Sequence, residues 1–450
     1  MRYSALFLLT TALMGAVDVG VSPTPYAGWS NSFPADENFF PLAVWLQSPG
    51  NAQAFKNLGI NTYVGLWDGP TEAQLSALKT AGMYVVCDQN SLALGSPSRS
   101  IVKSWMQGDE PDNAQSDGNG GFGPPITPTE IQNRYAAMKS GDATRPVLLN
   151  LGQGVAWDGW YGRGTRTNHP EDYPEYMKGG DIVSFDIYPV TSTDAAIKGN
   201  LWYVGQGVER LVTWSAGKKV VWNAVECTHI NSSVLPTPAQ IRSEAWMSII
   251  HGSRGILWFV HEWVPSFSEP GLLRYPANMD AVKSVNAQIK SLAAVLNGPT
   301  IAGEVTAHSS NGGVPLKTMM KRRGTDTYLF VVAMRDGTTS GTFTLTGLTG
   351  TQSAEVLGEG RSVTVTQGAF SDTFTGYGVH LYKIPAAAGG GGGSGGGGSG
   401  GGGTPPPSGG GSSSGDSGGG GGGGGGCGLT GAEALLAMVG LLLRRRLSRR

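Results

Sequence analysis

The stretch Val102-Lys-Ser-Trp-Met-Gln-Gly-Asp-Glu-Pro-Asp112 is a short apolar segment that runs directly into three acids around a proline. Its first five residues have the composition of a buried strand. Acids placed this close repel one another, and burying them costs desolvation free energy. A chain that places Asp109, Glu110 and Asp112 where a strand ends therefore needs a reason in the surrounding structure.

Seven further segments have the same length and apolar character, and segments with helical patterning lie between them. The strand candidates are Leu42–Leu46, Thr62–Leu66, Tyr84–Cys87, Val102–Met106, Pro146–Asn150, Ile182–Ile187, Val220–Val225 and Gly255–Val260. One intervening segment starts at Thr71, a candidate N-cap, and stops at Gly82. Strand-helix units that number eight in about 260 residues predict a (β/α)8 barrel over residues 23–299. An open doubly wound sheet is the alternative, but Gln47–Asn51 after the first strand is no glycine-rich phosphate turn.

The segment from residue 300 to 385 has a different pattern, with short alternating strands separated by turn residues. The candidates are Thr327–Ala333, Gly341–Thr346, Ser362–Thr366 and Gly378–Ile384. They predict a small antiparallel β-sandwich domain that packs on the barrel. We expect this domain to be a structural cap, and ligand binding through exposed aromatic residues is the alternative.

Both ends of the chain have the composition of export and anchoring signals. Residues 1–22 combine Arg2, a short apolar run and small residues, which predicts a secretory signal peptide rather than a buried helix. Residues 386–426 are almost wholly Gly, Ser and Pro and predict a flexible linker. Residues 427–450 follow with Cys427, an apolar run shorter than the roughly 20 residues of a full membrane span, and an arginine cluster that favours the cytoplasmic side.

This order of linker, cysteine, short apolar helix and arginines resembles the bacterial C-terminal sorting tails of the MYXO-CTERM type. The resemblance implies that Cys427 is the point of processing and lipid attachment. A plain transmembrane helix is the alternative, and it gives the same topology. We therefore expect a secreted protein that is held at the cell surface, associated with the outer membrane of a bacterium.

Charge and cysteine content exclude several other classes of protein. The chain has 32 basic and 33 acidic side chains, so it lacks the basic excess that nucleic-acid binding requires. Cys87 and Cys227 are too few for a disulfide framework, and no His/Cys spacing indicates zinc. We expect a monomer that uses no metal and no organic cofactor.

Two acids occupy corresponding places in the predicted barrel. Functional side chains of such barrels lie at the C-terminal ends of the strands. Glu110 follows the fourth strand candidate, and Glu226 ends the seventh. Two carboxyl groups about 5 Å apart can hydrolyse a glycosidic bond with retention, one as acid/base and one as nucleophile. Ordinary salt bridges are the alternative role for both acids.

Residues 38–300 thus resemble the clan A retaining glycoside hydrolases. The resemblance implies that Glu110 is the acid/base and Glu226 the nucleophile. Asp109 departs from the Asn-Glu-Pro of the family and places a carboxylate where a donor to the substrate 2-hydroxyl is usual. Tyr188 matches the tyrosine that hydrogen-bonds the nucleophile, and Trp258 matches the floor under the reacting sugar. A packed tyrosine at the barrel rim is the alternative for Tyr188.

Further polar and aromatic residues end the other strands and are candidates for sugar contact. They are Trp45, Trp67, Asp68 and His261, with the aromatic loop Trp157-Asp-Gly-Trp-Tyr161 after the fifth strand. Sugars present C–H faces that stack on such rings. We expect the substrate to be a polysaccharide or oligosaccharide, β-linked. A non-catalytic carbohydrate-binding protein on a degenerate barrel is the alternative.

Overall fold

The protein is described by a computed structural model that covers residues 24–386. The predicted signal peptide, the linker from residue 387 onward, Cys427 and the C-terminal tail lie outside the described residues. Within residues 24–386, no helix has both the length and the apolar character needed to cross a membrane.

A ring of parallel strands forms the N-terminal domain. Its strands are β1 (Leu42–Trp45), β2 (Thr62–Val64), β3 (Tyr84–Cys87), β4 (Val102–Met106), β5 (Val147–Leu151), β6 (Ile182–Phe185), β7 (Val220–Val221), β8 (Asn223–Glu226) and β9 (Ile256–Phe259). Strands β7 and β8 are separated by Trp222 alone, so they are two halves of one barrel strand. Because the sheet order runs from β7 through β6 and β1 to β9 and β8, the sheet closes on itself. The predicted (β/α)8 barrel is confirmed.

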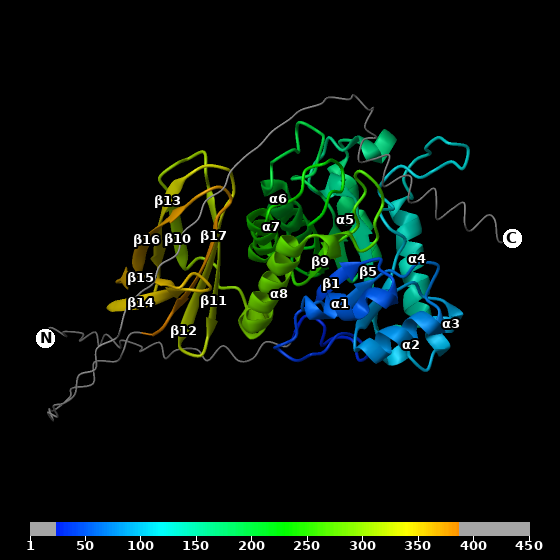
Figure 1. Ribbon diagram of the computed structural model, residues 1–450, viewed down its shortest axis with the longest axis horizontal. Helices are drawn as coiled ribbons and strands as arrows, with labels where there is room; N and C mark the ends of the chain where they lie inside the picture. Colours follow the sequence, from blue (N-terminus) through cyan, green and yellow to red (C-terminus); the bar gives the residue numbers. More distant parts are fainter. Residues whose placement is uncertain (1–23, 387–450) are drawn as a thin grey trace, which may run out of the picture.

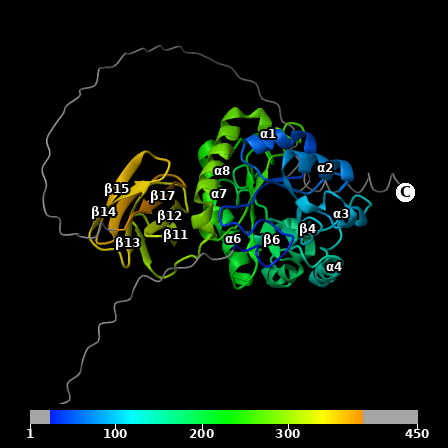
Figure 2. The same ribbon diagram turned by 90° about the horizontal axis from the view of Figure 1, so that it is seen from below.

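Helices surround this ring, as the view along the barrel in Figure 2 shows. They are α1 (Ala52–Asn57), α2 (Glu72–Ala81), α3 (Ser91–Gly95), α4 (Pro128–Gly141), α5 (Tyr173–Tyr176), α6 (Trp202–Trp214), α7 (Pro238–His251) and α8 (Pro276–Asn297). Local chemistry sets the ends of α2. Thr71 and Gln74 form a capping box at its start, and Gly82 ends it with φ 68°, which only glycine adopts without strain.

Aromatic residues near the N-terminus fill one end of the barrel. Tyr26 and Phe33 are buried against Trp222 inside the ring. The indole Nε1 of Trp222 donates to the Tyr26 hydroxyl at 2.8 Å, and the rings of Phe33 and Trp222 lie 5.6 Å apart. This plug closes the end at which the strands begin. The strand C-termini at the other end remain for function, as is usual for the fold.

The C-terminal domain is an antiparallel sheet that encloses its own apolar core. Its strands are β10 (Val305–Ser309), β11 (Leu316–Arg323), β12 (Asp326–Ala333), β13 (Thr339–Leu345), β14 (Thr351–Val356), β15 (Arg361–Thr366), β16 (Ala369–Phe374) and β17 (Val379–Ile384). The all-β domain was predicted, although the strands join in one continuous order, β10-β13-β16-β15-β14-β17-β12-β11. The sequence pattern missed β10, β11, β14 and β16.

Strand β12 lies between two cores and joins the domains. Leu329 and Val331 face the core of the β domain, whereas Phe330 and Val332 belong to the core shared with the barrel helices. The Phe330 ring stacks on Trp246 of α7, with centroids 5.7 Å apart and planes 10° from parallel. Figure 1 shows the β domain beside α7 and α8. Because successive side chains of a strand point to opposite faces, β12 packs on the β-domain core with one face and on the barrel helices with the other.

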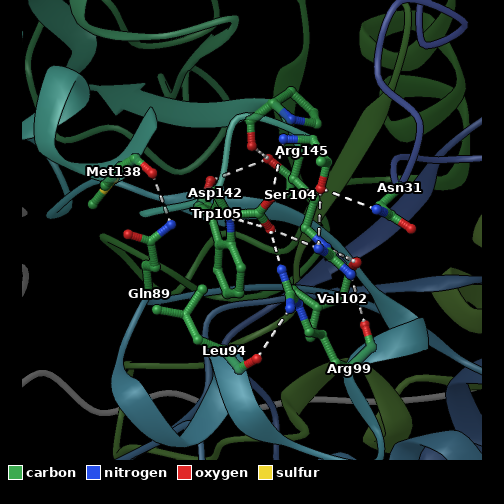
Figure 3. A network of polar contacts seen from close by, with 12 residues as sticks. Asn31, Gln89, Leu94, Arg99, Val102, Ser104, Trp105, Met138, Asp142 and Arg145 are labelled. Atoms are coloured by element: carbon green, nitrogen blue, oxygen red, sulfur yellow. Dashed lines mark hydrogen bonds and ion pairs between the residues drawn. The ribbon is translucent and has the colours of Figure 1, made fainter. Parts of the chain in front are cut away.

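A buried ionic network ties α4 to the start of β4 (Figure 3). Asp142, just after α4, accepts hydrogen bonds from Arg145 at 2.6 Å, from Arg99 at 3.0 Å and from the Trp105 indole at 3.2 Å. The side chains of Asp142 and Arg145 are only 2% and 3% exposed. Burial by itself raises the pKa of Asp142, but hydrogen bonds from Thr144, Arg99 and Arg145 outweigh it and hold that pKa well below its usual range.

We expect Asp142→Asn to lower the free energy of unfolding by about 3 kcal/mol, because Arg145 keeps its charge but loses its buried partner. A carboxyl with a depressed folded pKa stabilises the fold above its unfolded pKa of about 3.9, and the contribution disappears as the pH falls toward the folded value. The difference between the two proteins should thus be constant at pH 5–8 and shrink below pH 4. Urea unfolding at several pH values measures this difference.

The control is Glu130→Gln, which removes an exposed ion pair with Arg134 one helical turn away. Such pairs contribute about 0.5 kcal/mol or less. An equal loss in both variants would show that the Asp142 network does not stabilise the fold as described.

Candidate active site

Glu110 sits on a strained turn at the C-terminal end of β4. Its backbone has φ 41°, in the left-handed region that non-glycine residues rarely occupy. Its N–H donates to the Asn150 carbonyl at 3.1 Å, and its carbonyl accepts from the Asn113 N–H at 3.1 Å. Leu46 and Asp68, after β1 and β2, have positive φ values as well, 44° and 50°. Strained residues of this kind are concentrated at functional sites, and here they gather at one end of the barrel.

The carboxyl groups of Glu110 and Asp186 share a hydrogen bond. Burial and the charges of Asp186 and Asp109 raise the pKa of Glu110 well above its ordinary value, so Glu110 keeps its proton and donates it to Asp186. Burial also raises the pKa of Asp186, whereas the bonds from Glu110 and Tyr188 oppose that rise. The Tyr188 hydroxyl donates to Asp186 Oδ2 at 2.9 Å. Within the pair, Glu110 is therefore the proton donor and Asp186 the acceptor.

Asp109 is held by a chain of hydrogen bonds across three strands. Ser184 of β6 donates to Asn150 Oδ1 at 2.7 Å, and Asn150 Nδ2 donates to Asp109 Oδ1 at 2.9 Å. Because the Ser184 hydroxyl donates to the amide oxygen of Asn150, the amide nitrogen of Asn150 is the atom that faces Asp109. Burial and the nearby Asp186 raise the pKa of Asp109 to about 7.

Asp112, the third acid of the opening stretch, has a structural role. Its side chain is fully buried, accepts from the Gly152 N–H at 2.9 Å and from the Tyr173 hydroxyl at 3.0 Å, and lies near the Arg163 guanidinium. These partners attach the loop after β4 to the loop after β5. Of the three acids, Glu110 and Asp109 line cavities, and Asp112 anchors the two loops.

Two cavities meet at Asp186 and Tyr188. The outer cavity is lined by Glu110, Gln153, Trp160, Tyr161, Asp186, Tyr188, Ser192, Thr193, Asp194 and Asn231. The inner one is lined by Trp45, Asp109, Asn150, Asp186, Tyr188, Ala224, Leu257 and Phe259. The outer cavity offers aromatic faces and many hydrogen-bonding groups around the protonated Glu110. This is the composition of a site for a polar ligand with apolar faces.

Glu226 lies in a different environment from Glu110. It is fully buried and lines neither cavity. Its carboxylate accepts from the Val190 and Thr191 N–H groups at 2.6 and 3.0 Å, in the loop after β6. Burial raises the pKa of Glu226. The carboxyl group of Glu244 of α7 donates a hydrogen bond to Glu226, so these two acids form a second carboxyl pair. The structure therefore places Glu110 beside Asp186, and Glu226 beside Glu244.

Two expectations about neighbouring residues are wrong. The Tyr188 hydroxyl bonds Asp186 rather than Glu226. Trp258 does not form a floor in the cavity, because its indole is fully buried toward the helices and donates to Asn286 of α8 at 3.0 Å. Successive side chains of a strand alternate between faces. Its neighbour Phe259 therefore takes the inward position and lines the inner cavity.

The other candidates spread around the barrel mouth. Trp45 lines the inner cavity beside Asp109, whereas Asp68 is exposed on the loop after β2. His261 is fully buried, and its Nε2 bonds the Leu46 carbonyl at 3.0 Å. Burial lowers its pKa to about 4, so the ring is neutral. Trp67 packs edge-on against His261, and neither residue lines the two cavities.

Sequence reasoning missed Asp186 as a member of the site, although the signal was present. Asp186 ends a buried strand as Glu110 and Glu226 do, and the same rule of strand C-termini applies to it. The aromatic loop after β5 was identified, and the structure places its Trp160 and Tyr161 at the outer cavity with ring centroids 4.8 Å apart. Cys87 and Cys227 are buried free thiols.

Comparison with known proteins gives distant structural likeness. No family model and no curated protein matches the chain. An α-amylase from Geobacillus thermoleovorans, in complex with acarbose, aligns with 78% of this chain and 99% of its own, at 10% identity and a TM-score of 0.49. α-Galactosidase I from Mortierella vinacea aligns with 78% and 98%, at 11% identity and 0.47. A GH30 endoxylanase from Clostridium papyrosolvens aligns with 77% and 97%, at 12% identity and 0.41. At these values the activity of this chain has to be argued from its own site.

We expect Asp186→Asn to lower the pKa of Glu110 toward the ordinary glutamate value of about 4.3, because the substitution removes the charge that opposes ionisation of Glu110. Carboxyl ¹³C NMR titration, with the Glu110 signal assigned through Glu110→Gln, measures this pKa directly. Asp194→Asn is the matched control, since Asp194 lines the same cavity but does not shift Glu110. Burial and Asp109 keep part of the rise, so the contradicting outcome is a Glu110 pKa that does not fall at all in Asp186→Asn, which would show that Asp186 is not its proton-sharing partner.

Proposed function

We propose that the protein is a secreted glycoside hydrolase that cleaves β-linked polysaccharides or oligosaccharides with retention. The observation that carries the proposal is the pair of carboxyl groups of Glu110 and Asp186 that lines the outer cavity, in which burial and the neighbouring charge raise the pKa of Glu110 well above its ordinary value. Glycosidic cleavage needs one carboxylic acid to protonate the departing oxygen and one carboxylate to stabilise the positive charge that develops on the sugar. The pair supplies both groups.

The surroundings of the pair suit a sugar ring. Trp160 and Tyr161 offer ring faces for the C–H side of a sugar, and Tyr161 is 48% exposed. Gln153, Ser192 and Asn231 offer side-chain donors and acceptors for hydroxyl groups. The same features would suit a carbohydrate-binding protein, but binding alone gives no reason to bury a protonated acid against a carboxylate.

We assign Glu110 as the acid/base and Asp186 as the second carboxylate. Glu110 donates its proton to the leaving oxygen and later takes a proton from the attacking water, while Asp186 attacks the anomeric carbon. Glu226, the other candidate nucleophile, has both carboxylate oxygens engaged by backbone N–H groups away from the cavity. The two carboxyl groups of a retaining enzyme lie about 5 Å apart, so an entering sugar has to separate Glu110 from Asp186.

The test is a glycan panel with three variants and identification of the released products. Glu110→Gln and Asp186→Asn should each lower kcat by about 10²–10⁴-fold, because each removes one of the two reacting groups. Glu110→Ala should recover with azide on substrates with good leaving groups. Glu226→Gln should retain most activity once its fold is verified by thermal unfolding.

The opposite pattern, with Glu226→Gln inactive and Asp186→Asn active, would return the nucleophile to Glu226. Inverted products, seen by NMR of the first anomer released, would contradict double displacement. Binding of glycans by calorimetry with no turnover of any of them would favour the carbohydrate-binding alternative.

We further propose that the mature protein is attached to the cell surface through Cys427, with the residues after it removed. The support is compositional: a Gly/Ser/Pro linker, a cysteine, a short apolar run and arginines in that order. One acyl chain binds membranes only marginally, so durable attachment requires a diacyl group or its equivalent. Cys427→Ala should leave turnover intact and release the protein from the surface. Intact-mass analysis of surface-extracted protein checks this, and a chain that still ends at Arg450 would contradict processing.

A further inference from the structure

A cavity of about 400 Å³ lies at the opposite end of the barrel from Glu110. Its walls come from three parts of the chain that are distant in sequence. They are the segment with Pro25 and Trp29, the loops before β7 and β9, and the end of α8 together with β11 of the β domain. The volume is within the range of small-molecule sites, about 300–1,000 Å³.

The charged residues that line this cavity all have the same sign. They are Lys218, Lys219, Arg254 and Lys321, and no acid lines it. Arg254 is close enough for its charge to act on Lys321: burial first, and then the charge of Arg254, lower the pKa of Lys321 to about 6. Within residues 24–386, neither of these two side chains forms an ion pair with a carboxylate, unlike Arg145 with Asp142. A lysine buried beside another positive charge is costly to keep charged without a counter-charge.

The end of α8 supplies only part of that counter-charge. Lys321 Nζ donates to the carbonyls of Leu296 and Gly298 at 3.1 and 2.6 Å, and Arg254 donates to the Leu296 carbonyl as well. A helix C-terminus carries roughly half a negative charge. The helix end therefore offsets less than one full charge, and above about pH 6 Lys321 is protonated beside Arg254 only if a further negative charge is present.

We propose that this cavity binds a small organic anion, with its sulfate, phosphate or carboxylate group between Arg254 and Lys321. A planar guanidinium and an ammonium together suit an oxyanion, because they combine a fork of donors with a point charge. The apolar part of the ligand lies against Trp29, Ile249 and Met319, which line the same cavity. Since Arg254 precedes β9 and Lys321 belongs to β11, the ligand bridges the barrel and the β domain.

If Lys321 takes up a proton when an anion binds, it takes part in binding. A merely structural role of Lys321 would give no proton uptake. The charged groups that face Lys321 are Arg254, from the turn before β9, and Lys218 and Lys219, from the turn before β7, while Tyr26 lies beside Arg254. Among the four cations that line the cavity, Lys321 is the most deeply buried, with 1% of its surface exposed. An anion beside it favours its charged form, so binding above pH 6 takes up a proton and weakens as the pH rises.

The probes are sulfate, whose charge is constant between pH 6 and pH 8, and 2-naphthalenesulfonate, which adds an apolar body. We expect calorimetry on the full chain, with its C-terminal tail, to show binding of both probes. The naphthalene compound should bind more tightly than sulfate. Affinity should fall from pH 6 to pH 8, with proton uptake detected in buffers of different ionisation enthalpy. Lys321→Met should weaken binding about tenfold or more and abolish the proton uptake, and Arg254→Gln should weaken binding similarly.

The control is Lys290→Met, which removes an exposed cation of α8 that does not line the cavity and should leave affinity unchanged. If Lys321→Met unfolds, Arg254→Gln and the pH dependence of the unaltered protein decide. Equal affinity for neutral 2-naphthalenemethanol, or unchanged affinity in Arg254→Gln, would overturn the proposal. Because the readout is binding, it is independent of whether the chain hydrolyses glycans.

Discussion

A strand in a closed parallel ring turns only every second side chain toward the barrel axis, and the composition of the site depends on this constraint. Along β6 and the residues after it, Ile182 and Tyr188 face the interior while Val183 and Ile187 face the helices. Asp186 shares the inward phase and meets Glu110 there. The same rule turns the indole of β9 outward and its neighbouring phenylalanine inward. The position of a residue in its strand therefore decides whether its side chain points into the barrel and can contribute to the site.

Burial of carboxyl groups is the second constraint, and the protein meets it in two ways. Asp112 accepts hydrogen bonds from fixed donors and lies near a guanidinium, and these partners oppose the rise in its pKa that burial causes. Glu110 and Asp186 instead share a proton, and so do Glu226 and Glu244. The two proton-sharing pairs are chemically alike. They differ in position, because Glu110 and Asp186 line the outer cavity, whereas Glu226 and Glu244 do not.

Features with local causes could be predicted from the sequence, and features with nonlocal causes could not. The strands of the barrel and the ends of α2 follow from apolar runs and capping residues, and Glu110 at the mouth of β4 follows from the fold. The partner of Glu110 does not follow in this way. Asp186 and Glu226 both end strands, and the difference between them arises from the loop after β6, whose backbone N–H groups at Val190 and Thr191 take up the Glu226 carboxylate. The outward direction of Trp258 could have been predicted from the sequence, because side chains alternate between the two faces along β9.

The two ends of the barrel carry groups of opposite charge, and apolar side chains of the barrel interior lie between them. The groups that shift Glu110 all lie at the mouth, namely Asp186, Asp109 and Asp112. The charge that shifts Lys321 is that of Arg254, at the closed end. Between them lies a close-packed core of inward side chains from every strand. The charges that shift Glu110 thus do not include Arg254 or Lys321, and the charge that shifts Lys321 is not that of Glu110 or Asp186. Binding at one end should for this reason leave the proton shared by Glu110 and Asp186 in place.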